Sequence, residues 1–105
     1  MIYKIYRETF RADKRPDDNE FERSFNEFQE IYKKYGVRVI IALENVDNPN
    51  EGYLITVYRD NAHYEETVAK IRDDPIYKEL TKELQEYQES INVKTMKLMP
   101  GSPEP

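Results

Sequence analysis

The single histidine of the chain, His63, is the side chain best suited to acid–base chemistry. An imidazole titrates near neutral pH, so His63 could act as a general base or as a ligand-binding group in a cleft. Asp60 and Asn61 are both plausible N-caps, however, and either would place His63 in the first turn of a helix. We favour this second interpretation, in which the histidine is structural and bonded locally.

Tyrosine is the second residue type with chemistry to offer, with nine copies in a chain that has no tryptophan. Tyr58, Tyr64 and Tyr77 could line a pocket and hold an aromatic ligand by ring stacking and hydroxyl hydrogen bonds. Alternatively, tyrosines fill the core and a dimer interface, with each hydroxyl reaching water. We favour the structural use, and the pocket stays a candidate.

Two arginines, Arg7 and Arg38, lie inside predicted strands. A guanidinium group there could face a cleft and orient an acidic ligand. It could equally pair with a carboxylate across a dimer. Both interpretations are open, so the two arginines join the histidine and the three tyrosines as candidate ligand-pocket residues.

Metal and cofactor chemistry finds little support in this sequence. One histidine and no cysteine exclude multi-histidine and cysteine-bound metal sites, although carboxylate sites remain open. The acidic runs "PDDNE" and "IRDDP" are explained by helix capping. Three glycines are too few for a glycine-rich phosphate loop, and no defensible Ser-His-Asp pattern is present. The sequence therefore predicts no metal and no cofactor.

The elements that must position these residues begin with a strand over 1–10, "MIYKIYRETF". A helix starts after Asp17, which can cap it, with Glu20 three residues later as in a capping box. Gly36 ends this helix, because glycine enters the left-handed conformation without steric cost. The helix has one apolar stripe, made of Phe21, Phe25, Phe28, Ile31, Tyr32 and Tyr35.

Two strands follow, over 37–46 and 53–60, and the polar turn "DNPNEG" joins them as a hairpin. A second helical region runs from about 61 to 90. The tripeptide "DDP" interrupts it, since Asp74 can cap a new helix and Pro75 can occupy its first position.

The segment "INVKTMKLM", over 91–99, alternates as a fourth strand, and "PGSPEP" is a flexible tail. We therefore expect one domain over 1–99 and a C-terminal tail over 100–105. The element order predicts a ferredoxin-like α+β fold, βαββαβ, in which one four-stranded antiparallel sheet carries its helices on one face.

The middle strands carry apolar residues on both faces. Successive residues of a strand point to opposite faces. In the second strand one face would carry Val37, Val39, Ile41 and Leu43, and the other face would carry Ile40 and Ala42. A sheet face open to water should be polar at alternate positions, so the second face needs a cover. Since no segment of the chain remains to provide it, we expect a homodimer.

This layout, together with the stretch "AHYEETVAKIRDDPIYKELTKEL", resembles the dimeric α+β barrel superfamily, which includes antibiotic-biosynthesis-type monooxygenases and NIPSNAP-like proteins. The resemblance extends from about Ile2 to Met99. It rests on the broken second helix, with its acidic-Pro step and the aromatic Tyr77 just beyond. It implies that two sheets pair into a barrel and that a ligand lies between a subunit's own sheet and helices.

Activities in this superfamily include cofactor-independent oxygenation of polycyclic phenols, haem degradation, and small-molecule isomerisation or decarboxylation. The haem-degrading and oxygenase members resemble one another in using a tryptophan, which this chain lacks, and His63 lies earlier than a haem ligand would. The resemblance implies a monooxygenase-like enzyme or a binder of a small aromatic ligand. A non-enzymatic dimeric scaffold or interaction protein is the alternative.

The net charge of -5 opposes binding to phosphate backbones and to anionic lipid. RNA-binding RRM domains share the topology, but this chain has Glu51 where their third strand starts with Lys or Arg. No apolar run approaches the roughly 20 residues of a membrane span, and the N-terminus is too charged for a signal peptide. We expect a cytoplasmic protein with no nucleic-acid or membrane partner.

Overall fold

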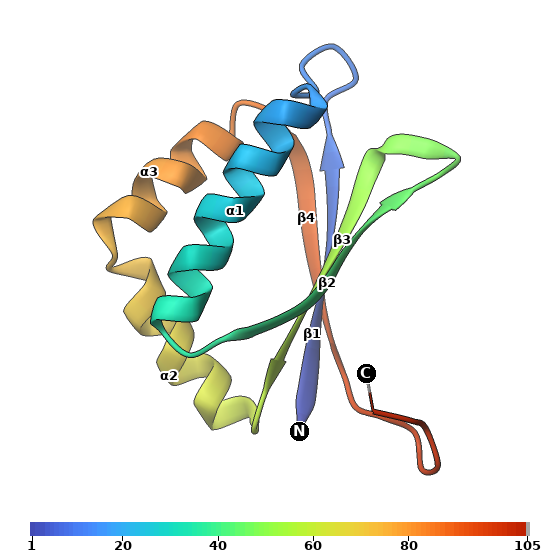
Figure 1. Cartoon of the computed structure of the whole chain (residues 1–105), viewed down its shortest axis with the longest axis vertical. Coiled ribbons are helices and arrows are strands. Elements are labelled where there is room, and N and C mark those ends of the chain that lie inside the picture. The colour runs from blue at the N-terminus through green and yellow to red at the C-terminus, as the bar shows by residue number, and fades with distance from the viewer. Residues whose placement is uncertain (105) are drawn as a thin grey trace.

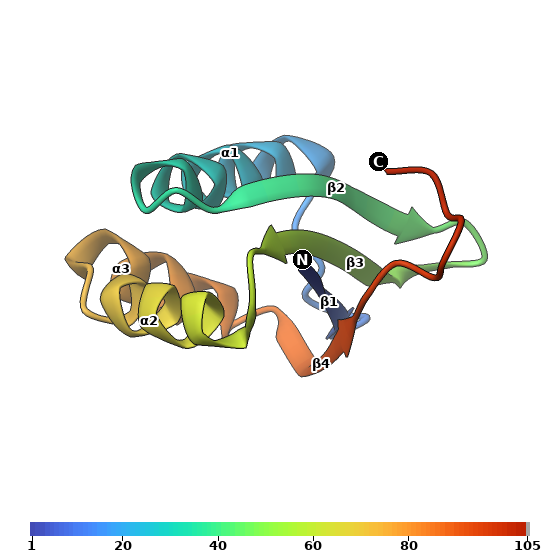
Figure 2. The same ribbon diagram turned by 90° about the horizontal axis from the view of Figure 1, so that it is seen from below.

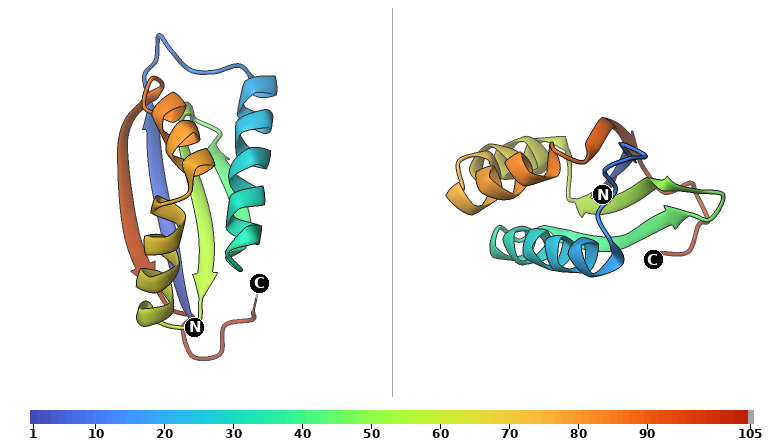
Figure 3. Two further views of the ribbon diagram at one scale, coloured as in Figure 1. Left: turned by 90° about the vertical axis from the view of Figure 1, so that its left-hand side faces the viewer. Right: turned by 90° about the horizontal axis from the view of Figure 1, so that it is seen from above.

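The computed structural model describes residues 1–104, except for the side chain of Ile40. This range folds into a sheet and a layer of helices that covers one of its faces (Figures 1 and 3). The elements in chain order are β1 (Ile2–Phe10), α1 (Asp18–Lys34), β2 (Arg38–Asn45), β3 (Asn48–Tyr58), α2 (Asn61–Arg72), α3 (Pro75–Leu84) and β4 (Gln88–Met96). This order confirms the predicted ferredoxin-like α+β fold.

The sheet has the strand order β2-β3-β1-β4, and each neighbouring pair is antiparallel. The first strand of the chain is therefore central, between β3 and β4. Its side chains alternate between the two faces. Lys4, Tyr6 and Glu8 face the helices, whereas Ile5 and Arg7 face the other way.

Both predicted ends of the first helix are confirmed. The Asp17 carboxylate accepts a hydrogen bond from the backbone N–H of Glu20 at 2.9 Å, which caps the N-terminus of α1. After α1, Gly36 has a φ angle of 74° and occupies the left-handed region that ends many helices. Local chemistry alone determines these two boundaries.

The predicted interruption at "DDP" divides the second helical region into α2 and α3. The Asp74 carboxylate accepts hydrogen bonds from the backbone N–H groups of Ile76, at 2.9 Å, and Tyr77, at 3.4 Å. Pro75 is the first residue of α3, where its missing N–H leaves no unpaired donor.

The same carboxylate also joins α1 to the α2–α3 junction, although the two lie about 40 residues apart in sequence. It accepts hydrogen bonds from the hydroxyl of Tyr35, at 2.7 Å, and from the ammonium group of Lys34, at 3.0 Å. The side chain of Asp74 is only 2% exposed. We call these three residues the Asp74 clamp.

The second helical region ends at Leu84, several residues earlier than predicted. The fourth strand occupies Gln88–Met96 instead of the predicted 91–99. Its first residue pairs with Phe10 of the central strand. Pairing through backbone hydrogen bonds takes up polar as well as apolar residues, so the boundary does not follow the apolar pattern.

The alternation predicted for β2 is wrong, because its pairing with β3 shifts between Val39 and Ile41. Val39 faces the helices, whereas Ile41 pairs with Ile55 on the opposite face. One extra residue in a strand reverses which face the following side chains occupy. The predicted orientation of the Ile40 side chain lies outside the described residues.

The buried core gathers where the end of α1, the start of β2 and the α2–α3 junction meet. Its buried apolar residues are Ile31, Val37, Tyr58, Ile71 and Leu80. We call this region the packed end. Toward the start of α1 and the end of β1, the helices and the sheet enclose open space instead.

No helix covers the other face of the sheet, which we call the outer face (Figure 2). There Ile41, Leu43 and Met96 are 44%, 51% and 44% exposed. The segment 97–104 lies on this side (Figures 2 and 3), and Pro105 of the predicted tail is outside the described residues. Within the described range no helix combines the length and apolar character needed to cross a membrane.

Candidate ligand-binding cleft

A cleft of about 670 Å³ lies between the helices and the sheet. Its size falls within the range of about 300–1,000 Å³ that is typical of small-molecule sites. Aromatic rings dominate its walls; they include Tyr6, Phe10, Phe21, Phe25, Phe28 and Tyr32. The apolar stripe of α1 thus serves partly as core and partly as the wall of this cleft.

The floor of the cleft contains a row of four residues that lie side by side across the strands. Strand pairing places Gly52 between Glu44 and Glu8, and Ile91 on the far side of Glu8. Because glycine has no side chain, it leaves space beside Glu8, which the ring of Phe10 borders. A Cβ atom added at Gly52 would meet the Leu43 carbonyl oxygen at 3.5 Å, which is ordinary contact.

The two carboxyl groups of this row differ in their partners. Glu44 accepts from the guanidinium of Arg15, which is also 3.7 Å from Asp18. Glu8 has no ion pair or hydrogen bond through its side chain within the described residues. Burial raises the pKa of the Glu8 carboxyl, since removal from water disfavours its charged form.

Several tyrosines also line the cleft, among them Tyr6, Tyr32 and Tyr58. Burial raises the pKa of Tyr6, and the nearby Tyr58 and Tyr64 raise it further. Burial likewise raises the pKa of Tyr32 and of Tyr58. These phenols therefore stay protonated at neutral pH and can donate hydrogen bonds to a ligand.

Some polar atoms around this cluster lack a well-formed hydrogen bond. In the described part of the chain, the buried atoms without a partner are Thr56 Oγ1, Tyr58 OH and Gln88 Nε2. Thr56 and Tyr6 interact with the Tyr58 hydroxyl and lower its pKa, against the larger effect of burial, but neither makes a direct bond of good geometry. Unsatisfied buried polar groups call for a partner.

The structure brings the three predicted tyrosines together. Tyr58, Tyr64 and Tyr77 all line the cleft. The rings of Tyr58 and Tyr64 meet edge to face with centroids 5.0 Å apart, and Tyr77 packs in the same way on Phe28 at 6.1 Å. Tyr58 is also part of the core, so the pocket and the core interpretations both apply to it.

His63 does not line the cleft. Its backbone N–H donates to the Asp60 carboxylate at 2.8 Å, and its Nδ1 accepts from the backbone N–H of Arg59 at 3.1 Å. The imidazole packs edge-on against Tyr58, 5.6 Å between centroids. These local bonds match the structural interpretation of His63.

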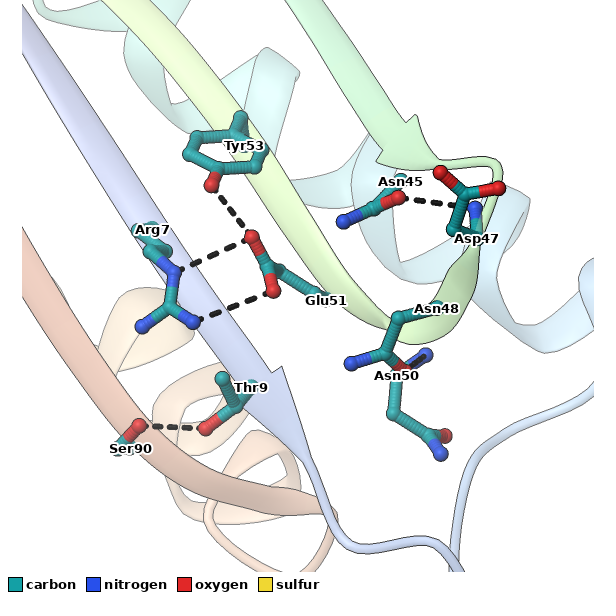
Figure 4. Close-up of polar contacts among 9 residues, drawn as sticks. All are labelled: Arg7, Thr9, Asn45, Asp47, Asn48, Asn50, Glu51, Tyr53 and Ser90. Carbon is teal, nitrogen blue, oxygen red and sulfur yellow. Dashed lines mark hydrogen bonds and ion pairs between the residues drawn. The ribbon is translucent and has the colours of Figure 1, made fainter.

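Arg7 and Arg38 lie on the outer face, away from the cleft. Arg7 donates from Nε and Nη2 to Glu51, each at 3.2 Å, and the Tyr53 hydroxyl donates to the same carboxylate (Figure 4). These bonds raise the pKa of Arg7 and lower that of Glu51. Strand pairing places Arg38 opposite Val57.

The residue that sequence reasoning missed is Glu8. In the structure the even positions of β1 face the helices, and these are Ile2, Lys4, Tyr6, Glu8 and Phe10. A carboxyl group in such a row must enter the space between sheet and helices. No motif marks it, and its lack of a partner depends on residues far away in the sequence.

Two other kinds of site have less support. No group of three metal-binding side chains occurs among the described residues. A shallow hollow of about 830 Å³ lies beside the β1–α1 loop, lined by Arg11, Lys14, Arg15 and Glu86 among others. The described residues that line this hollow include no buried polar atom without a partner, so the cleft is the stronger candidate.

Over nearly its whole length the chain has the same fold as solved NIPSNAP and antibiotic biosynthesis monooxygenase structures, as predicted. The chain is similar to a NIPSNAP family protein of unknown function from Agrobacterium tumefaciens, with 20% identity, 98% of this chain and 92% of that chain covered, and a TM-score of 0.84. It is also similar to a NIPSNAP-like domain protein from Burkholderia xenovorans, with 20% identity, 98% and 89% covered, and a TM-score of 0.83.

A third similar structure is SnoaB, a cofactor-independent oxygenase from Streptomyces nogalater, with 16% identity, 98% of this chain and 97% of that chain covered, and a TM-score of 0.71. No protein-family profile matches the sequence, and neither does any curated protein. Identities this low establish the fold and leave the activity to be argued from the site.

Proposed function

We propose that this protein is a homodimer in which each cleft binds a small planar aromatic ligand. The observation that carries the proposal is the cleft itself, an aromatic-walled space beside the core with unsatisfied polar groups around it. Ring faces contribute stacking, while protonated phenols and Glu8 contribute oriented hydrogen bonds.

A second candidate function is a cofactor-independent monooxygenation in the same cleft. The fold similarity to SnoaB favours it. Glu8 is suited to accept a proton from an acidic C–H or O–H group of the substrate, because a raised pKa makes a carboxylate a stronger base. Dioxygen would be the co-reactant: a CH₂ group would become C=O, and the second oxygen atom would leave as water.

The dimer is supported by the outer face. Apolar side chains from three strands, Ile41, Ile55 and Met96, lie on this side of the sheet, and two of them are over 40% exposed. Burying such a patch against a second copy stabilises by about 25 cal/mol per Å² of apolar surface. The Arg7–Glu51 pair beside it supplies a polar rim.

Light scattering tests the dimer. We expect twice the chain mass of 12.6 kDa at micromolar concentration. Leu43→Glu puts a charge on the outer face and should yield monomer. Val46→Glu is the matched control, since Val46 is 96% exposed at the hairpin tip, and it should remain dimeric. A wild-type protein that is monomeric and folded would contradict this part of the proposal.

Calorimetric titration with 1-naphthalenemethanol, a neutral planar probe, tests the cleft. We expect saturable binding to the wild type and none to Gly52→Val, whose methyl groups would extend over the floor beside Glu8. An added Cβ atom makes only ordinary contacts there, with the Leu43 carbonyl oxygen and the Phe10 ring, so we expect this variant to fold, and its melting temperature is the control. Absence of binding to the wild type would favour the non-enzymatic scaffold.

Oxygen consumption with polycyclic phenols then separates enzyme from binder.

A further inference from the structure

The charge distribution of the cleft indicates which aromatic ligands it prefers. Its lining residues include four whose carboxyl groups are not on the outer face, Glu8, Asp18, Glu22 and Glu44, and two arginines, Arg15 and Arg72. Glu44 is paired with Arg15, and Glu51 is paired on the outer face. Glu8 is left at the floor with no cation beside it.

The two strand neighbours of Glu8 leave space beside its carboxyl group. Gly52 is its neighbour on β3, and the neighbour on β4, Ile91, is 51% exposed. A ligand group could therefore reach the carboxylate from within the cleft. A partly buried carboxylate without a partner is costly, and an incoming cation removes that cost by forming a charge-assisted hydrogen bond.

The walls of the cleft are suited to a positive charge as well. Aromatic rings attract cations to their faces. The chain itself uses two of these rings in this way: the ammonium of Lys4 lies 3.9 Å from the centroid of the Tyr64 ring, and the guanidinium of Arg15 lies 4.7 Å from that of Phe21. The phenol oxygens nearby can accept hydrogen bonds from an ammonium group.

From these observations we infer that the cleft selects an arylalkylamine, an aromatic ring system with an aliphatic amino group, bound as its ammonium ion with the nitrogen paired to Glu8 and the rings between the walls. This inference rests on the proposed function and adds the chemical class of the ligand. Arg72, at the end of α2, is the cleft cation that would favour an anionic ligand instead.

The test uses three naphthalenes that differ in one group: 1-naphthylmethylamine, 1-naphthalenemethanol and 1-naphthoate. Each is titrated calorimetrically into the full chain at pH 7.5 and low salt. We expect the amine to bind at least about tenfold more tightly than the alcohol, which corresponds to about 1.4 kcal/mol, and the carboxylate to bind most weakly. Raising the salt concentration should weaken binding of the amine only.

Variants identify the pairing group. Glu8→Gln should reduce the affinity for the amine to that of the alcohol and leave the alcohol unchanged. Glu79→Gln, an exposed residue of α3 outside the cleft, makes the same change in net charge and should retain the preference. Equal losses in both variants would mean general electrostatics rather than pairing at Glu8, and would overturn the inference.

Two other results would also overturn it, and they differ in what they imply. Equal binding of the amine and the alcohol to wild type would remove the inference but leave an aromatic-ligand site in place. Tighter binding of 1-naphthoate than of the amine would mean that Arg72 pairs with the ligand and that the cleft prefers anions. Failure of all three probes to bind would reject the proposed function together with the inference.

Discussion

The packed end and the cleft are built from the same helices and the same sheet, yet they use their side chains in opposite ways. At the packed end, Ile71 and Leu80 are 3% and 6% exposed and fill the space between the layers. In the cleft, rings of equal or larger size, such as Phe25, leave about 670 Å³ between them. One half of the interface supplies stability, and the other supplies space.

Two carboxyl groups, one at the packed end and one in the cleft, also differ in whether their hydrogen-bonding capacity is satisfied. Asp74, at the packed end, accepts four hydrogen bonds, and the bonds from Tyr35 and Lys34 hold its pKa well below the usual range. Glu8, in the cleft, has none from a side chain or backbone of the described residues, and burial raises its pKa. A satisfied group stabilises a fold, whereas an unsatisfied one is available to a ligand.

The largest expected effect is on stability at the packed end. Leu80→Ala should lower the free energy of unfolding by about 3 kcal/mol, because it leaves a cavity in a filled core. Phe25→Ala should lower it by only about 1 kcal/mol, since its ring borders open space. Urea denaturation measures both. Equal losses would mean that the cleft is closed in solution.

The Asp74 clamp should give the next largest effect. Asp74→Ala removes a cap and two inter-helix bonds, and should lower the melting temperature by on the order of 10 °C. Asp73→Ala is the matched control, because that neighbouring side chain is exposed, and it should shift melting by less than about 3 °C.

The pH dependence gives the clamp a second readout. A carboxyl whose folded pKa is depressed stabilises the fold fully above its ordinary value of about 3.9, and this contribution is lost as the pH falls through the folded pKa. The wild type should therefore lose its advantage over Asp74→Ala below about pH 4. An advantage that does not change with pH would show that the ionised form of Asp74 is not what matters.

The third effect has the opposite sign. Glu8→Leu removes an unpaired carboxyl from the cleft floor and should raise the melting temperature by on the order of 5 °C at pH 7.5. Because the folded pKa is raised, the cost of Glu8 is full above that pKa and fades as the pH falls toward about 4. The gain should shrink over the same interval. A destabilised variant would indicate a partner for Glu8 that the structure does not include.

The smallest expected effect belongs to His63. His63→Ala should change the free energy of unfolding by less than about 1 kcal/mol and leave the affinity for 1-naphthalenemethanol unaltered, as expected for a partly exposed residue with local bonds. Thermal melting and calorimetric titration are the two measurements. A selective loss of binding would give His63 a role in the ligand site after all.

Local chemistry made much of this fold predictable. Asp17, Gly36 and Pro75 each determine a boundary through their own backbone or cap preference, and all three act as their types suggest. The shift between Val39 and Ile41 was not predictable, because it depends on pairing with β3. The start of β4 at Gln88 depends in the same way on pairing with β1.

The residues of the candidate cleft also differ in whether their own type made them predictable or whether distant residues decide their role. Three tyrosines could be nominated because their type suits a pocket, and the structure brings them to one cleft. Glu8 could not be nominated, since its importance comes from what lies around it: Gly52 on one side, and no cation within reach. Arg7 and Arg38 could not be assigned a face, because a strand pattern does not say which side meets the helices.

The central position of β1 has a consequence for how this chain must fold. The Nζ atom of Lys4 bonds to the hydroxyl of Thr95 at 2.6 Å, across 91 positions of sequence. Contacts between such distant segments slow folding, because a long loop must close before they form. During synthesis on the ribosome, the edge of β1 that pairs with β4 would have no strand partner until β4 emerges. The cleft would therefore be among the last features to form, and a growing chain could not bind the proposed ligand before then.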